Sequence, residues 1–213
     1  MIFVIGKQCY IALNEIMKAL HRHTRSMLRF VFICVLCTGA VRAAEAPAQV
    51  EVIVSVRQQR LMVLADHRVL AIYPVSTSKF GTGDWPGSYG TPLGTLSVRE
   101  KIGGGAPLGA VFKSRRLTGE VLTPNARGRD PIVTRILWLE GEEPANRNSF
   151  VRCIYIHGTP QEKMLGRPAS YGCIRMRSRD VAELYEFIER GTTVHITKSN
   201  LPVSSAGLVA GIL

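Results

Sequence analysis

The pattern that decides the fold lies in residues 151–177, which read VRCIYIHGTPQEKMLGRPASYGCIRMR. The apolar run over 151–156 is typical of a strand, and His157 stands at its end. Cys173 follows 16 residues later, in a Ser-Tyr-Gly-Cys segment that favours a tight turn. A histidine at a strand end and a cysteine in a glycine turn are the components of a nucleophilic Cys/His site.

Such a site requires an activated thiol. A free thiol is mostly protonated near pH 7, so it needs a base or positive surroundings to become the reactive thiolate. His157 is predicted to take the proton, and Arg175 is predicted to favour the anion. The amides of Gly172 and Cys173 could donate to the oxyanion formed on attack. The alternative is an inert core cysteine and a structural histidine, which is the commoner situation when each stands alone.

The sequence around this segment predicts a mainly β domain. Runs with the period or composition of strands lie at residues 52–56, 61–64, 69–75, 95–101, 134–139 and 193–197. Residues 65–68 are polar and predict a hairpin turn. Residues 78–94 hold five glycines and two prolines, so they form a long loop, and long loops in compact domains are often functional.

One helix is expected directly after the cysteine turn. Ser178 is predicted to cap it, Asp180 to lie in its first turn and Gly191 to end it. Its apolar face comprises Val181, Leu184, Tyr185 and Ile188. Nothing in the sequence indicates a second domain, so we expect a single domain over residues 50–197 and a tail over 198–213.

The first 43 residues read as a signal peptide. Residues 30–41, FVFICVLCTGAV, carry no charge and follow a basic region, and Val41-Arg42-Ala43 suits cleavage after Ala43. The basic region is long, so the true start could be Met17 or Met27. The alternative is an uncleaved membrane anchor, although the apolar run is shorter than the about 20 residues of a spanning helix. Both readings place the domain outside the cytoplasm, in the periplasm or cell envelope.

Cysteine usage and charge exclude several classes of protein. Of five cysteines only Cys153 and Cys173 follow the leader, so a disulfide scaffold is excluded, and Cys153 is expected to be a buried strand thiol rather than a partner of Cys173. Residues 44–213 carry 21 basic and 15 acidic side chains. Export argues against nucleic acid, and a moderately basic surface suits an anionic envelope polymer, although a basic face without a partner is equally common.

Four motifs of the chain can be taken together: His157-Gly158, Ser170, GCIRM at residues 172–176 and TPLG at residues 91–94. This set resembles the L,D-transpeptidase catalytic domain, the YkuD family, over residues 50–197. The resemblance implies a single β-sandwich domain in which the cysteine attacks a peptidoglycan stem tetrapeptide and releases D-Ala. The thioester then passes its acyl group to the amine of another stem, which gives a 3-to-3 cross-link. Such an enzyme is a penicillin-insensitive acyltransferase.

The resemblance also implies roles for single residues. Cys173 corresponds to the nucleophile, His157 to the proton acceptor, and Gly172 with Tyr171 to the oxyanion turn. Substrate-binding positions correspond to Ser170, Arg175 and Gly158. The family usually has a second histidine where this chain has Tyr171. No metal or organic cofactor is implied, the partners are peptidoglycan stem peptides, and the enzyme is expected to be a monomer with a membrane tether only if the leader is uncleaved.

Several alternatives stay open at this stage. Water as the acyl acceptor would make the protein an L,D-carboxypeptidase, and Tyr171 is the one feature that favours a non-catalytic wall-binding homologue. A cysteine peptidase of another fold is disfavoured because its Cys usually precedes its His. Trp85 and Tyr89 could line a substrate groove or anchor the loop. Arg127, Arg129 and Arg135 could attract stem carboxylates or be merely solvated.

Overall fold

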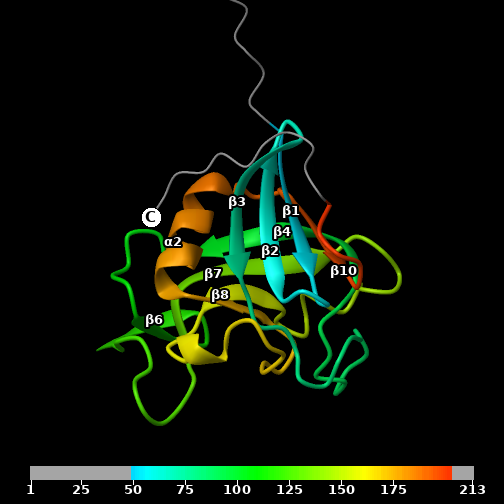
Figure 1. Ribbon diagram of the computed structural model, residues 1–213. Helices are drawn as coiled ribbons and strands as arrows, with labels where there is room; N and C mark the ends of the chain where they lie inside the picture. The colour runs from blue at the N-terminus through cyan, green and yellow to red at the C-terminus, as the bar shows by residue number, and fades with distance from the viewer. Residues whose placement is uncertain (1–48, 203–213) are drawn as a thin grey trace, which may run out of the picture. The chain divides into compact units, whose positions relative to one another are not determined.

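The computed structural model of the protein describes residues 49–202 (Figure 1). The predicted leader, and the tail beyond residue 202, lie outside the described residues. The elements are β1 Val50–Ser55, β2 Arg60–Ala65, β3 Arg68–Pro74, β4 Gly94–Ile102, β5 Ala110–Lys113, β6 Arg116–Val121, β7 Ile132–Gly141, β8 Tyr155–Gly158, the 3-10 turn η1 Glu162–Met164, β9 Ile174–Met176, α2 Ser178–Phe187 and β10 Thr193–Thr197. No helix within residues 49–202 is both long and apolar enough to cross a membrane.

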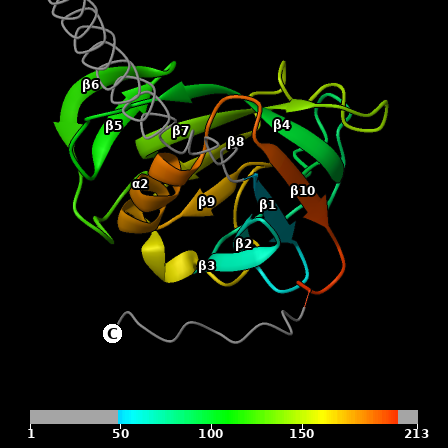
Figure 2. The same cartoon turned by 90° about the horizontal axis from the view of Figure 1, so that it is seen from above.

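All ten strands belong to one sheet, with the order β3-β2-β1-β10-β4-β7-β5-β6 and with β8 between β7 and β9. The predicted hairpin turn joins β2 to β3, and Asp66 and His67 both have positive φ there, as such a two-residue turn requires. The first and last strands, β1 and β10, pair in parallel (Figure 2). The second parallel pair is β8 with β9, and it carries the Cys/His segment.

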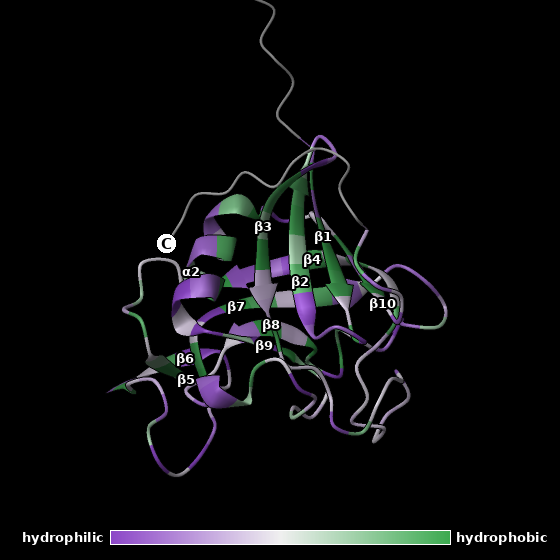
Figure 3. Ribbon diagram, viewed as in Figure 1, coloured by the Kyte–Doolittle hydropathy of each residue, from purple (hydrophilic) through white to green (hydrophobic). Residues whose placement is uncertain are grey.

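The sheet bends over itself and encloses one hydrophobic core. In Figure 1 the strands β1, β2 and β3 run across β4, β7 and β8. Val52 of β1, Leu137 of β7 and Leu184 of α2 are nevertheless members of the same buried cluster, because alternate side chains of each strand point inward. The hydropathy colouring shows apolar residues along β1 and β7 (Figure 3). The prediction of a mainly β domain with one helix after the Cys173 turn is confirmed.

The strand predicted at residues 151–156 is wrong in its first half. Residues 151–153 form a turn, Cys153 has φ +57°, and β8 begins only at Tyr155. The Arg152 amide donates to the Asn148 carbonyl and the Cys153 amide to the Phe150 carbonyl, which are turn bonds rather than ladder bonds. Cys153 and His157 therefore do not share a strand, and the expectation that Cys153 is a strand thiol is wrong.

Other details of the secondary structure also differ from the sequence prediction. Ser178 is the first residue of α2 and its side chain does not cap the helix; the Glu162 carboxylate accepts from the Ser178 amide at 3.0 Å instead. The helix ends at Phe187, and Gly191 turns the chain toward β10 with φ +85°. Strands β5, β6 and β9 were not predicted from the sequence. β5 has four residues and β9 has three, which is too short for a clear period, and β6 is largely exposed.

Candidate active site

The pairing of β8 with β9 brings the predicted nucleophile and base to one face of the sheet. His157 lies opposite Arg175, and Ile156 lies opposite Ile174. Both isoleucines point into the main core, so their neighbours His157 and Arg175 point to the other face. Cys173 directly precedes β9 and packs in a second cluster with Tyr155, on this same face. The strand pairing and the packing of Cys173 therefore place two residues that are 16 positions apart in the sequence on one face of the sheet.

The Cys173 thiol is held between backbone groups. Its Sγ accepts a hydrogen bond from the Tyr155 amide at 3.4 Å and donates to the Cys153 carbonyl at 3.3 Å. Burial raises the pKa of Cys173 to about 11, although the Tyr155 amide and the charges of Arg152 and Arg175 act in the opposite direction. The positive surroundings expected from Arg175 are thus outweighed by burial, and the resting side chain is a protonated thiol near pH 7.

His157 is buried and neutral. Its Nδ1 lies 2.8 Å from the Gly158 carbonyl oxygen, and a carbonyl can only accept, so Nδ1 carries the ring hydrogen and Nε2 keeps its lone pair. Burial lowers the pKa of His157 to about 4, more than the Gly158 bond and Asp130 raise it. The imidazole therefore has the tautomer and the charge state of a base ready to accept a proton.

Hydrogen bonds from neighbouring residues shape the turn before Cys173. The Ser170 hydroxyl donates to the Cys173 carbonyl at 2.6 Å and accepts from the Gly172 amide at 3.2 Å, so this amide, a predicted oxyanion donor, is engaged within the turn. The Thr91 hydroxyl donates to the Gly172 carbonyl at 3.0 Å. Gly172 has φ +125°, and a Cβ there would stand 3.2 Å from the Gly90 carbonyl oxygen, which explains the need for glycine.

Arg175 and Gly158 both make close contacts within the protein itself. Arg175 is buried, forms an ion pair with Asp130 and donates to the Ser76 hydroxyl at 3.2 Å, which joins β9 to two distant segments. Gly158 packs so tightly against β7 that a Cβ would lie 2.6 Å from the Val133 carbonyl oxygen. Their predicted substrate-binding roles stay predictions. Sequence reasoning missed Asp130, since a single acid in a loop rich in Gly and Arg carries no signal.

Most of the aromatic and arginine side chains that the sequence suggested for substrate binding lie at the surface. Tyr171, Tyr89 and Trp85 are each more than half exposed, so the two loop aromatics do not anchor the glycine-rich loop by burial. Arg129 pairs with Glu120. Arg135 is buried and donates to the carbonyls of Ala106 and Thr134, so it is not part of a solvated basic face.

A buried ion pair holds the glycine-rich loop beside the turn that precedes Cys173. Arg152 Nη1 lies 2.8 Å from Asp84 Oδ1, with side chains 10% and 3% exposed. The same guanidinium donates to the Gly83 carbonyl at 3.0 Å and to the Gly90 carbonyl at 2.8 Å. The Asp84 carboxylate also accepts from the Asn148 amide at 2.6 Å. Sequence reasoning missed this pair, whose members are 68 residues apart.

Breaking this pair is expected to cost much of the stability of the domain. Arg152→Met leaves the Asp84 carboxylate buried without its cation, so the free energy of unfolding should fall by about 3–5 kcal/mol. The matched control is Arg99→Met, which removes an ion pair of 2.6 Å to Glu140 whose side chains are 55% and 36% exposed. That variant should lose no more than about 1 kcal/mol. Urea unfolding measures both, and equal losses would contradict the assignment.

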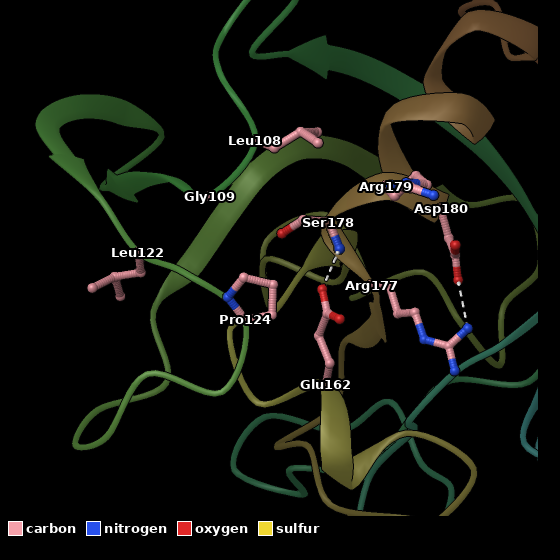
Figure 4. Close-up of a pocket in the computed structure, with 9 residues that line it drawn as sticks. All are labelled: Leu108, Gly109, Leu122, Pro124, Glu162, Arg177, Ser178, Arg179 and Asp180. Atoms are coloured by element: carbon pink, nitrogen blue, oxygen red, sulfur yellow. Dashed lines mark hydrogen bonds and ion pairs between the residues drawn. The ribbon is translucent and has the colours of Figure 1, made fainter.

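Two hollows lie away from the Cys/His pair. One of about 400 Å³ is shown in Figure 4 and lies at the start of α2, where Arg177 is 3.9 Å from Asp180 and Glu162 caps the helix. The other, of about 390 Å³, is lined by Trp85 and other residues of the glycine-rich loop and by residues within 144–148. Neither of these two hollows is lined by Cys173 or His157. Within residues 49–202 no three His, Cys, Asp or Glu side chains are grouped as metal ligands would be.

Comparison with known proteins places this arrangement in a family. The sequence model of the L,D-transpeptidase catalytic domain (YkuD) matches residues 49–196. Bacillus subtilis YqjB, provisionally named an L,D-transpeptidase, is 32% identical over 155 residues, which are 72% of this chain and 74% of YqjB. Bacillus subtilis YkuD, with the same provisional name, is 31% identical over 112 residues, 52% of this chain and 63% of that protein.

A solved L,D-transpeptidase structure from Mycobacterium smegmatis aligns with a TM-score of 0.46 at 18% identity, over 70% of this chain and 59% of that one. The chain thus spans about three quarters of YqjB but less than two thirds of YkuD and of the mycobacterial protein. The match to the family model covers most of the chain and includes both His157 and Cys173. The chain therefore belongs to the L,D-transpeptidase catalytic domain family.

Proposed function

We propose that this protein is an exported, cysteine-dependent L,D-transpeptidase that acts on peptidoglycan stem tetrapeptides. The observation that carries the proposal is the placement of the Cys173 thiol and the neutral His157 imidazole on one face of the β8/β9 pair. Family membership supports the transpeptidase activity, and the leader predicted at residues 1–43 supports export.

In the acylation step, Cys173 Sγ attacks the carbonyl carbon of the third stem residue while His157 Nε2 takes the thiol proton. The bond to the terminal D-Ala nitrogen breaks, and His157 returns the proton to that nitrogen, so D-Ala leaves and a thioester remains. The pKa of His157 is about 4 and that of Cys173 is about 11, so near pH 7 the imidazole is unprotonated and the thiol is protonated. Both groups therefore start neutral. The thiol proton therefore has to move to His157 Nε2 in the course of the attack.

In the second step, an amine attacks the thioester carbonyl carbon. His157 accepts the amine proton, the carbon–sulfur bond breaks, and the thiolate of Cys173 takes the proton back. The amine of another stem peptide gives the 3-to-3 cross-link. Water gives the tripeptide instead, so an L,D-carboxypeptidase would share the first step and differ in the acceptor only.

The test is a reaction of the purified protein with disaccharide tetrapeptide, with and without a second stem that offers an amine. Intact-mass spectrometry should show an adduct of the substrate minus D-Ala, and D-Ala should appear in solution. A dimer formed with the second stem supports transpeptidation, whereas tripeptide alone would identify a carboxypeptidase. If neither adduct nor D-Ala appears, the enzymatic proposal is wrong and the non-catalytic wall-binding homologue is left.

A further inference from the structure

Three aromatic side chains cluster at the surface beside the nucleophile turn. Phe80, Tyr89 and Tyr171, which we name the aromatic cluster, are 52%, 55% and 63% exposed. Their ring centroids lie 5.5 Å apart for Phe80 and Tyr171, 5.6 Å for Phe80 and Tyr89, and 6.0 Å for Tyr89 and Tyr171. Single exposed apolar side chains are normal, whereas a contiguous exposed group such as this one marks a candidate binding site.

Backbone bonds hold the cluster in place next to Cys173. Ser78 and Ser170 form an isolated bridge, and the Lys79 amide donates to the Ser170 carbonyl at 3.1 Å. The Ser78 hydroxyl donates to the Tyr89 carbonyl at 2.5 Å and accepts from the Phe80 amide at 3.0 Å. The loop that carries two of the rings is thus fastened to the turn that carries the third, so a ligand meets a surface that is already ordered.

The charge on the cluster limits which ligand it fits. The Lys79 ammonium lies 4.3 Å from the ring centroid of Tyr171 and 5.2 Å from that of Phe80, and it donates to the Tyr171 hydroxyl at 3.0 Å. This cation already occupies the electron-rich ring faces and repels a second positive group. The cluster therefore suits a ligand that is neutral or negative, with an apolar face and groups that accept hydrogen bonds.

The size and position of the cluster narrow the ligand further. Three side chains are far fewer than the 20–30 residues per partner of a stable protein interface. Tyr171 precedes Cys173 by two residues. In a peptidoglycan donor bound at Cys173, the stem joins the reacting carbonyl to a sugar ring roughly 10 Å away, which is about the length of three extended residues.

We propose that the aromatic cluster is a saccharide subsite, which binds the N-acetylated sugar ring that carries the donor stem peptide. The inference rests on the proposed function, because it assumes that a stem peptide is the donor. The apolar face of a pyranose ring covers one or two aromatic rings, and its hydroxyl and acetamido oxygens can accept from Lys79. Tyr171, which stands where the family usually has histidine, then contributes binding surface rather than acid or base chemistry.

The test compares two ligands that differ in the sugar alone. The full chain with Cys173→Ala, which cannot turn over its ligand, is titrated with free tetrapeptide and with disaccharide tetrapeptide by calorimetry. Phe80→Ala and Tyr89→Ala are then introduced separately. Each should weaken binding of the disaccharide tetrapeptide about 3- to 10-fold, as loss of an aromatic contact of about 1 kcal/mol predicts, and should change binding of the free tetrapeptide less than about twofold.

Leu70→Ala is the matched control, because Leu70 is similarly exposed, at 48%, and lies near the far end of β3 from the loop. It should leave both affinities unchanged. Equal weakening of both ligands would mean that the cluster contacts the peptide or supports the turn, and no weakening would mean that the cluster does not bind donor at all; each result overturns the subsite. The proposed function is tested by a separate measurement, since it is wrong if the unmodified protein releases no D-Ala.

Discussion

Cys173→Ala is expected to reduce D-Ala release by at least about 10⁴-fold and to abolish the covalent adduct, since loss of a nucleophile removes the chemical step itself. The fold should persist, because Cys173 is a partly buried member of a small cluster whose buried residues, Phe112, Ile136 and Tyr155, are unchanged. Intact-mass spectrometry and D-Ala release measure the effect, and circular dichroism verifies the fold.

Cys153→Ala provides the matched control for the first prediction. Cys153 lies in the turn before β8, and its backbone carbonyl, not its side chain, accepts from the Cys173 thiol. Alanine keeps that carbonyl, so the Cys153 variant should still form the adduct. An adduct that survives in Cys173→Ala but disappears in Cys153→Ala would reverse the assignment of the nucleophile.

His157→Gln is expected to lower the acylation rate by about 10²- to 10⁴-fold near pH 7, the usual contribution of a positioned general base. Glutamine keeps a polar side chain of similar length but offers no basic nitrogen. In the unmodified protein the acid limb of the pH–rate profile should lie near the pKa of about 4 of His157, and it should disappear in the variant. Single-turnover rates of adduct formation between pH 4 and 8 measure both effects, and an unchanged profile would remove His157 from the mechanism.

The same histidine should make the stability of the fold depend on pH. The unfolded chain binds a proton on His157 near pH 6.5, whereas the folded chain binds it only near pH 4. The unfolded state therefore holds more protons between these values, and the free energy of unfolding should fall by on the order of 3 kcal/mol as the pH drops from above 6.5 to 4. Urea unfolding at pH 7 and pH 5 measures the decline, and His157→Gln should reduce it.

Cys173 should make the free energy of unfolding depend on pH in the alkaline range. Burial raises its pKa from 9.0 to about 11, so the unfolded chain loses this proton first as the pH rises. The contribution of Cys173 to the free energy of unfolding is at its maximum below pH 9 and is lost as the pH rises from 9 to 11. The Cys173→Ala protein should lack this part of the alkaline decline, which gives a readout that is independent of activity.

The secondary structure could be predicted where side chains follow a period and could not be predicted where they do not. The strands β1, β2 and β7 bury alternate or continuous apolar residues, and this pattern is visible in the sequence. The largely exposed β6 has no such pattern, and β9 is too short for one. The error at Cys153 has the same origin, because the apolar composition of residues 151–156 hides a turn that the amides of Arg152 and Cys153 close with the carbonyls of Asn148 and Phe150. The Arg152 side chain also bonds to carbonyls more than 60 residues away, which no local pattern reveals.

The sequence by itself determined the family, the mainly β architecture, the helix after the cysteine turn and the choice of His157 and Cys173 as the candidate base and nucleophile. Those features depend on residue type and spacing within short segments, which the printed chain displays directly. Only the tertiary structure decided that Arg175 faces Asp130, that Arg152 and Asp84 fasten the glycine-rich loop, and that Phe80 and Tyr89 meet Tyr171. The pKa values of His157 and Cys173 depend on the same long-range packing, because burial arises from residues that folding brings together from distant parts of the chain.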